Sequence, residues 1–137
     1  MNSGLKASEE IVDIYKELKT SKIKGLIFSI NSSNQLQFEH KMEKGFEYKQ
    51  LLDLLPQNEP RLVFYDFDFE TDEVPARKTN KLLMISWIPL TSKPRDRFTY
   101  SSNGLSVANQ LGAVQKQIQA DDVAGLDYEV VRKICLK

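Results

Sequence analysis

The sequence predicts an α+β fold, within the broad α/β class, in which helices cover both faces of one mixed sheet. Three observations carry this prediction. The run Leu82–Ile88 is apolar at every position except Ser86, which indicates an interior strand covered on both faces. Apolar residues recur at helical spacing both before and after the strand-like segments, so helices are available for both covers. The 137 residues fit a single domain, residues 1–137.

The first predicted element is a helix, and a short arm precedes it. Ser8 is suited to cap this helix, because a serine side chain accepts hydrogen bonds from free backbone N–H groups, and Glu9 and Glu10 favour the helix dipole. The buried side of the helix is predicted from a spacing of i, i+3, i+4 and i+7, at Ile11, Ile14, Tyr15 and Leu18. Residues 1–6 precede it and are expected to form a mobile N-terminal arm.

A hairpin and a second helix are expected next. Strands at 25–30 and 35–40 flank the turn-forming residues 31–34, and the second strand alternates strictly between apolar and polar residues. A helix over 46–55 ends before Pro56, since proline cannot continue a helix.

The second half of the chain predicts three more strand segments and two helices. The residues 61–70 alternate, with Val63, Tyr65, Phe67 and Phe69 on one side. An acidic loop at 71–80 precedes the apolar strand 82–88, and 98–100 is expected to form a short strand. A long helix then carries an apolar stripe, a loop covers 119–127, and a last helix follows; the stripe is Val107, Leu111, Val114 and Ile118.

Composition excludes several classes of protein. Lysine plus arginine and aspartate plus glutamate both number 19, so zero net charge does not favour nucleic acid or a membrane surface. A single cysteine excludes an intramolecular disulfide and fits a reducing compartment. No apolar run is long enough to span a bilayer, and acidic residues near the N-terminus do not suit a signal peptide. We expect a soluble intracellular protein.

The sequence indicates a binding module rather than an enzyme. His40 has no partner nucleophile, and Cys135 lies between apolar neighbours that favour a packing role. Acidic residues at alternate positions from Asp66 to Asp72 are similar to the start of a calcium loop, but Thr71 stands where that loop requires glycine. No glycine-rich phosphate loop occurs. No metal ion, cofactor or catalytic residue is therefore expected.

The segment 93–118 has the features of a partner-binding surface. Arg95 and Arg97 lie one residue apart, and in an extended segment their side chains would point the same way. The outer face of the following helix is poor in charge, whereas solvated helix faces are usually polar. That face is predicted to contain Leu105, Asn109, Gly112 and Lys116, with Ala108 beside them.

Several motifs occur in the same order as in a known family. The runs LLMISWIP at 82–89 and KPRDRFTYSS at 93–102 are followed by Ile118-Gln119-Ala120 and an acidic loop. Ser3-Gly4 stands at the N-terminus, and Leu55-Pro56 precedes the strand RLVFYDF. With these motifs the chain resembles the actin-depolymerising factor/cofilin family over nearly its whole length.

The resemblance implies a single ADF-homology domain with a sheet of about five strands, and it implies that actin is the partner. It also implies two groups of site residues in a monomeric protein. The monomer-binding group is Ser3, Gly4, Arg95, Arg97, Leu105, Ala108, Asn109 and Gly112. The filament group is Arg77, Lys78, Lys81, Arg132 and Lys133. Ser3 is a candidate for regulatory phosphorylation.

The chain departs from the family pattern in the long helix. Ala108, Asn109 and Gln110 occupy positions where basic residues are expected. We therefore expect monomer binding and filament depolymerisation with weak severing, and at most weak phosphoinositide binding, in the cytoplasm with the actin cytoskeleton. Lysine at Asn109 and Gln110 is expected to strengthen filament binding more than monomer binding.

Two relatives of the fold are alternatives. Coactosin-like proteins bind filaments without dismantling them, and glia maturation factor binds the complex that nucleates branched filaments. Pro60-Arg61 and the long strand that follows would suit the second alternative, whereas Trp87-Ile88-Pro89 and Ile118-Gln119-Ala120 favour the depolymerising branch.

Overall fold

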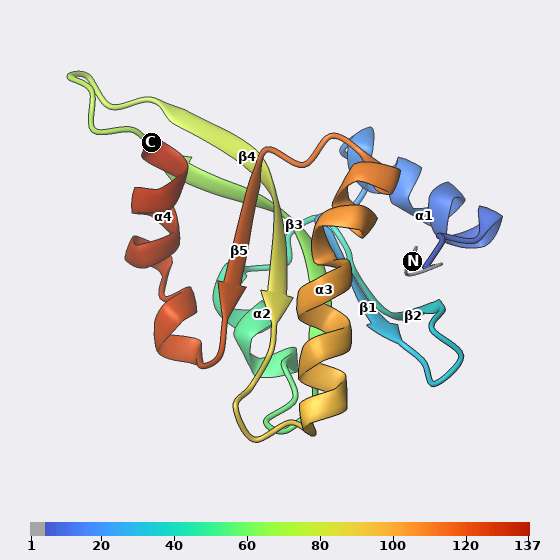
Figure 1. Ribbon diagram of the computed structural model, residues 1–137. Helices are drawn as coiled ribbons and strands as arrows, with labels where there is room; N and C mark the ends of the chain where they lie inside the picture. Colours follow the sequence, from blue (N-terminus) through green and yellow to red (C-terminus); the bar gives the residue numbers. More distant parts are fainter. Residues whose placement is uncertain (1–4) are drawn as a thin grey trace.

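The computed structural model describes residues 5–137 and, within them, contains a mixed sheet with helices on both faces (Figure 1). The elements in chain order are α1 (Glu9–Lys19), β1 (Gly25–Ile30), β2 (Leu36–Met42), α2 (Tyr48–Leu54), β3 (Arg61–Glu70), β4 (Lys78–Trp87), α3 (Pro94–Leu111), β5 (Lys116–Ala120), the 3-10 helix η1 (Val123–Leu126) and α4 (Tyr128–Leu136). The predicted α+β class is confirmed.

The strand order in the sheet is β2-β1-β3-β4-β5. Neighbouring strands run antiparallel except β4 and β5, which are parallel. Parallel neighbours need a crossover connection, and α3 supplies it. The position of α3 across one face of the sheet therefore follows from the chain path between β4 and β5.

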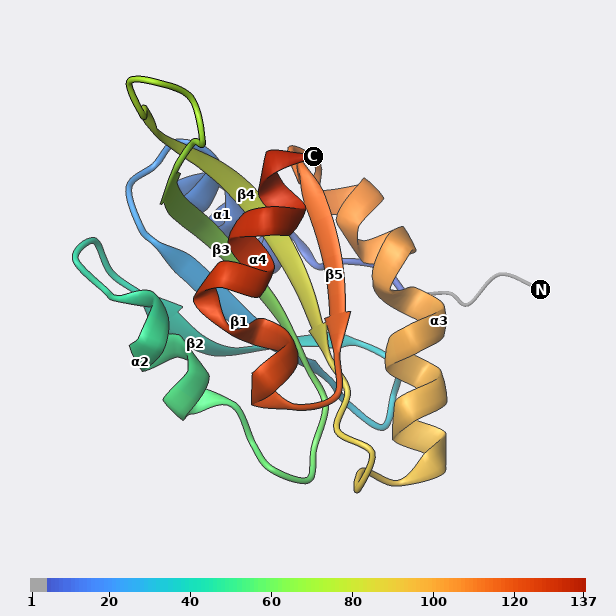
Figure 2. The same cartoon turned by 90° about the vertical axis from the view of Figure 1, so that its left-hand side faces the viewer.

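Two apolar cores lie on the two faces of the sheet (Figures 1 and 2). On one face, α1 and α3 cover Leu26, Phe28, Phe64 and Met84. On the other face, α2 and α4 cover side chains that include Ile27, Val63, Tyr65, Leu83 and Ile85. Successive residues of a strand point to opposite faces, so the apolar run in β4 supplies both cores, as predicted.

The N-terminal arm is anchored from residue 5 onward. Ser8 caps α1, because its Oγ accepts a hydrogen bond from the Ile11 N–H at 3.3 Å. The Leu5 side chain is only 2 % exposed and belongs to the core beneath α1 and α3. The expectation of a mobile arm over 1–6 therefore does not describe Leu5, and residues 1–4 lie outside the described part of the chain.

The helix α3 begins and ends earlier than its apolar stripe indicates. Residues 98–100 lie inside α3 and do not form the expected strand, since the helix starts at Pro94, and proline is favoured in the first helical turn. The helix ends at Leu111, where Gly112 adopts a positive φ of 82°. Ile118 lies in β5, and the predicted loop over 119–127 begins with the end of that strand.

The predicted stripe joined residues that pack on opposite faces of the sheet. Val107, Leu111 and Val114 pack in the core beneath α1 and α3, whereas Ile118 lies in β5 and in the core covered by α2 and α4. The expected loop before β4 is also shorter than predicted, since Lys78 already pairs with Glu70 across β3 and β4.

Candidate protein-binding surface

The exposed side of α3 carries two large apolar side chains. Phe98 is 71 % exposed and Leu105 is 61 % exposed. They are seven residues apart, or about two helical turns, so they lie on the same side of the helix. Residues at the same angular position extend this stripe in both directions. We call the set the α3 outer face: Arg95, Phe98, Ser102, Leu105 and Asn109, all exposed.

Hydrogen bonds near both ends hold α3 in place. The Tyr100 hydroxyl accepts a hydrogen bond from the Ile30 N–H at 2.7 Å, which ties the first half of α3 to the end of β1. The Tyr15 hydroxyl donates to the Gly112 carbonyl at 2.7 Å, which ties the end of α3 to α1. Burial raises the pKa of both phenols, so both stay neutral over the physiological pH range. The α3 outer face is therefore presented by a fixed helix.

A shallow hollow of about 520 Å³ lies on the C-terminal half of this helix surface. Its lining is Ser102, Leu105, Ser106, Asn109 and Gln110. The hollow combines one exposed leucine with hydroxyl and amide groups and contains no charged side chain. A partner that presents an apolar side chain with polar neighbours would match this chemistry.

Arg95 and Arg97 do not point the same way. Both lie in the first turns of α3, where residues two apart differ by about 200° around the helix axis. Arg95 is exposed on the α3 outer face, whereas Arg97 is half-buried. The Arg97 Nε atom is buried and has no hydrogen-bond partner among residues 5–137. The expectation of two parallel arginines was wrong, because it assumed an extended backbone.

Two other predicted surface residues are not on the α3 outer face. Ala108 is only 3 % exposed and packs into the core beneath α3. Gly112 follows the helix as its C-cap, and its N–H donates to the Ala108 carbonyl at 2.8 Å. Of the four helix residues predicted for the monomer site, Leu105 and Asn109 are exposed. Ser3 and Gly4 lie outside the described residues.

Sequence reasoning missed Phe98 and Gln110. Phe98 was assigned to a strand, although its spacing of seven from Leu105 indicates a shared helix face. Gln110 was considered only as a neutral replacement for a basic residue. In the structure its side-chain amide contacts the backbone of residues 5 and 7, and no local pattern indicates a contact between segments so far apart in the chain.

The predicted filament group is brought together where the projecting β3–β4 hairpin meets α4 (Figure 1). Two of its five cations, Arg132 and Lys81, form contacts between these segments. Arg132 donates to the Glu70 carbonyl at 2.9 Å and forms ion pairs with Asp72 and Glu129. Lys81 donates to the Cys135 carbonyl at 2.8 Å.

The remaining three cations of this group are exposed. Arg77 pairs with Glu73 at 2.7 Å, and the hydrogen bond from the guanidinium lowers the pKa of that carboxyl group. Lys78 lies at the start of β4 and Lys133 lies in α4. The β3–β4 hairpin and α4 are thus neighbours, and Arg132 and Lys81 form contacts between them.

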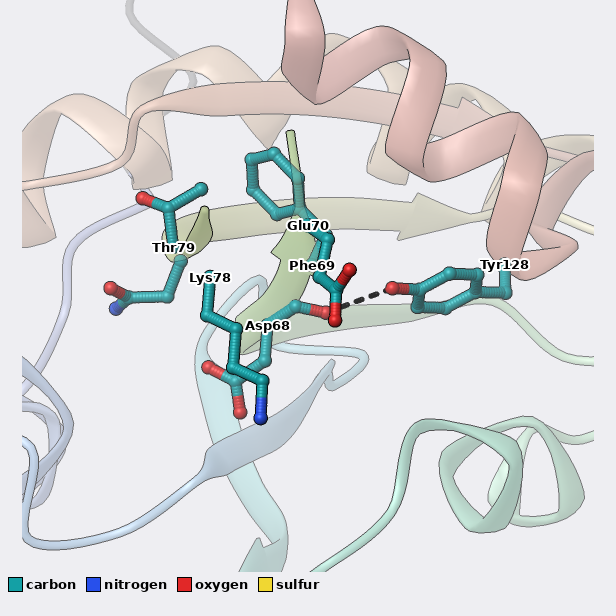
Figure 3. Close-up of a pocket in the computed structure, with 7 residues that line it drawn as sticks. Asp68, Phe69, Glu70, Lys78, Thr79 and Tyr128 are labelled. Carbon is teal, nitrogen blue, oxygen red and sulfur yellow. Dashed lines mark hydrogen bonds between the residues drawn. The ribbon is translucent and has the colours of Figure 1, made fainter. Parts of the chain in front are cut away.

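A separate depression of about 510 Å³ lies between the hairpin and α4 (Figure 3). Its lining includes Asp68, Glu70, Lys78 and Tyr128, and the Tyr128 hydroxyl donates a long hydrogen bond of 3.5 Å to the Asp68 carbonyl. Among residues 5–137, no three or more His, Cys, Asp or Glu side chains are arranged to hold a metal ion. The acidic side of β3 is instead paired, because Lys24 contacts Asp68 and Asn80 contacts Asp66.

Burial raises the pKa of the Cys135 thiol, although Lys81 and Lys116 lower it in part. A thiol that stays protonated is a poor nucleophile, so Cys135 has a packing role in the core beneath α4. Within residues 5–137, no helix combines the length and apolar character that crossing a membrane requires.

We predict that two neighbouring cations in α4 differ in their effect on stability. Arg132→Ala removes bonds to Glu70, Asp72 and Glu129 and is expected to lower the thermal unfolding midpoint by a few degrees. Lys133→Ala changes an exposed side chain and serves as the matched control, with an unchanged midpoint. Equal midpoints for the two variants in differential scanning calorimetry would contradict this assignment.

The fold is a mixed sheet with a core on each face, and it displays the helix α3 with two large exposed apolar side chains. The family model described as "Cofilin/tropomyosin-type actin-binding protein" matches residues 4–135. The chain therefore belongs to the cofilin/actin-depolymerising factor family.

Named relatives agree with this family over almost their full length. The chain is 32 % identical to a cofilin of Mycosarcoma maydis over 132 residues, which covers 96 % of this chain and 94 % of that protein. It is 32 % identical to actin-depolymerizing factor 2 of Oryza sativa subsp. japonica, with coverage of 96 % and 91 %.

Solved structures show the same fold. The crystal structure of Streptomyces griseoflavus cofilin matches with a TM-score of 0.82 and 28 % identity, and covers 95 % of this chain and 96 % of that chain. Actin depolymerization factor 2 of Plasmodium berghei has a TM-score of 0.83, 20 % identity and 99 % coverage of both chains. At this lower identity the likeness concerns the fold.

Proposed function

We propose that this protein binds actin monomers through the α3 outer face and promotes the disassembly and turnover of actin filaments in the cytoplasm. The observation that carries the proposal is the pair of exposed apolar side chains, Phe98 and Leu105, on one side of α3. Membership of the cofilin/actin-depolymerising factor family supports actin as the partner. The role is binding rather than catalysis.

The chemistry of the α3 outer face suits a protein interface. A few residues near the centre of an interface supply most of the binding energy, aromatic side chains and arginines foremost, whereas charged residues at the rim act mainly on association rate. Phe98 and Leu105 occupy the middle of the stripe, with Arg95 at one end and Asn109 at the other. Arg95 would meet an acidic area of the partner.

Weak severing is part of the proposal. Strong attachment along a filament requires a second contact on a neighbouring subunit, and the filament group is the candidate for it. Arg132 and Lys81 are occupied in bonds within the chain, and Arg77 is paired with Glu73. Fewer free cations favour a weak second contact and, for the same reason, weak phosphoinositide binding.

The proposal is tested by measuring three properties of the purified protein. Binding to fluorescently labelled actin monomers, co-sedimentation with filaments and single-filament microscopy should show monomer binding, filament shortening and rare severing. Filament binding without shortening would support a coactosin-like role. Binding to the branched-filament nucleating complex without actin binding would support a role like that of glia maturation factor. Either result would overturn the proposed function.

We predict that Arg95 contributes more to actin binding than Arg97. Arg95→Ala is expected to lower monomer affinity about tenfold, because arginines are frequent hot-spot residues and Arg95 is exposed on the α3 outer face. Arg97→Ala should have a smaller effect, since Arg97 is half-buried on another side of the helix. Lys49→Ala, an exposed lysine in α2, is the control. A loss with Arg97→Ala that exceeds the loss with Arg95→Ala would contradict this order.

A further inference from the structure

The Gln110 side chain forms two hydrogen bonds with the N-terminal arm. Its Oε1 accepts from the Ala7 N–H at 2.9 Å, and its Nε2 donates to the Leu5 carbonyl at 2.7 Å. A longer bond of 3.4 Å joins Nε2 to the Ser106 Oγ within α3. The two arm contacts span more than 100 residues of sequence, and they fix residues 5–7 against the end of α3.

The two bonds require a side-chain amide. An amide donates through its nitrogen and accepts through its oxygen, as a backbone peptide group does. Lysine or arginine at this position can donate to the Leu5 carbonyl but cannot accept from the Ala7 N–H. Glutamate can accept from the Ala7 N–H but, when ionised, cannot donate to the Leu5 carbonyl. The Gln110 amide can therefore form both bonds with the arm backbone, one as acceptor and one as donor.

Gln110 also lines the hollow on the α3 surface, beside Leu105 and Asn109. The Leu5 side chain, directly next to the bonded carbonyl, is buried in the core beneath α1 and α3. The arm is thus anchored twice at this point, by an apolar side chain and by the Gln110 amide.

We propose that Gln110 is a positioning residue, which holds residues 5–7 against α3 so that this segment and the α3 outer face meet the partner as one surface. This inference rests on the proposed function, since the partner is an actin monomer. It also bears on the expectation that lysine at Asn109 and Gln110 strengthens filament binding. Lysine at Gln110 removes the acceptor for the Ala7 N–H and is expected to weaken monomer binding, whereas lysine at the exposed Asn109 leaves both arm contacts in place.

The first test does not involve actin. Hydrogen exchange of the Ala7 amide, followed by NMR, is expected to be several times faster in Gln110→Ala and in Gln110→Lys than in the wild type. Gln117→Ala is the matched control, because Gln117 is an exposed glutamine in β5. Circular dichroism should show that all variants are folded. Unchanged exchange at Ala7 in both Gln110 variants would overturn the contact.

The second test separates positioning from direct contact with actin. Gln110→Ala is expected to lower monomer affinity about fivefold, as the loss of a typical hydrogen-bond contribution does. Ser3→Glu should lower affinity in the wild type, because it places negative charge at an interface with an acidic partner. Its effect should largely disappear in the Gln110→Ala background, where the arm is no longer held.

The comparison of Ser3→Glu in the wild-type and Gln110→Ala backgrounds tests whether Gln110 acts through the arm. Equal effects of Ser3→Glu in the two backgrounds would show that Gln110 does not act through the arm, and would overturn the inference. Wild-type affinity in Gln110→Ala, with faster exchange at Ala7, would overturn it as well. A wild type that does not bind actin would overturn the proposed function, and the exchange at Ala7 would still show whether Gln110 holds the arm.

Discussion

A protein that carries both Phe98→Ala and Leu105→Ala is expected to bind actin monomers at least about a hundredfold more weakly than the wild type. Both side chains are more than half exposed, so their truncation removes little from the core. Each is proposed as an anchor of the α3 outer face, and truncating a hot-spot residue costs about 2 kcal/mol or more of binding free energy. Monomer binding, measured by the fluorescence of labelled actin, is the direct measurement.

The control for this double variant is Leu54→Ala. Leu54 is 38 % exposed in α2, which covers the other face of the sheet, so actin affinity should remain that of the wild type. Thermal unfolding of both proteins should match the wild type. Retention of wild-type affinity by a folded Phe98→Ala, Leu105→Ala protein would remove the α3 outer face from the proposed site.

The sheet was predicted well because its signals are local. Alternation of period two assigned Val63 and Tyr65 to one face of β3, and they lie in the core covered by α2 and α4. The two-sided apolar run of β4 required helices on both faces, and both are present. A residue's neighbours two positions away are enough to show this pattern.

The start of α3 was not predicted because its signals compete. Phe98-Thr99-Tyr100 consists of residues that favour strands, and three residues are too few to show a period. Pro94 at the first helical position was the signal for a helix. Once the segment is helical, Arg95 and Arg97 separate and Phe98 joins Leu105, so one boundary error changed the membership of the candidate site.

Contacts between distant segments account for the other differences. Arg132 meets Asp72 across 60 residues of sequence, and Gln110 meets Leu5 across 105. Neither pair has a local pattern, because each arises only when two elements pack together. Residue type alone therefore placed Arg132 in the filament group and treated Gln110 only as a neutral replacement for a basic residue, whereas both form contacts within the chain.

Phe64→Ala is expected to destabilise the protein by about 3–5 kcal/mol, the usual cost of removing a fully buried phenylalanine. The Phe64 side chain is 0 % exposed and lies at the centre of the core beneath α1 and α3. Its ring meets Tyr15 edge-on at 5.2 Å and Phe28 at 5.7 Å between ring centroids. Alanine leaves a cavity between α1 and the sheet, which these rigid aromatic neighbours cannot fill by small shifts.

Phe98→Ala is the matched control for this change, since it removes the same atoms from a side chain that is 71 % exposed. Its free energy of unfolding should stay within about 0.5 kcal/mol of the wild type, while its actin affinity falls. Urea unfolding followed by the fluorescence of the buried Trp87 measures both proteins. A loss of stability in Phe98→Ala that equals the loss in Phe64→Ala would mean that Phe98 is a core residue and not an anchor for a partner. The expected result is that Phe64→Ala lowers the free energy of unfolding and Phe98→Ala lowers only the actin affinity. Phe64 would then be a residue that stabilises the fold, and Phe98 a residue that binds the partner.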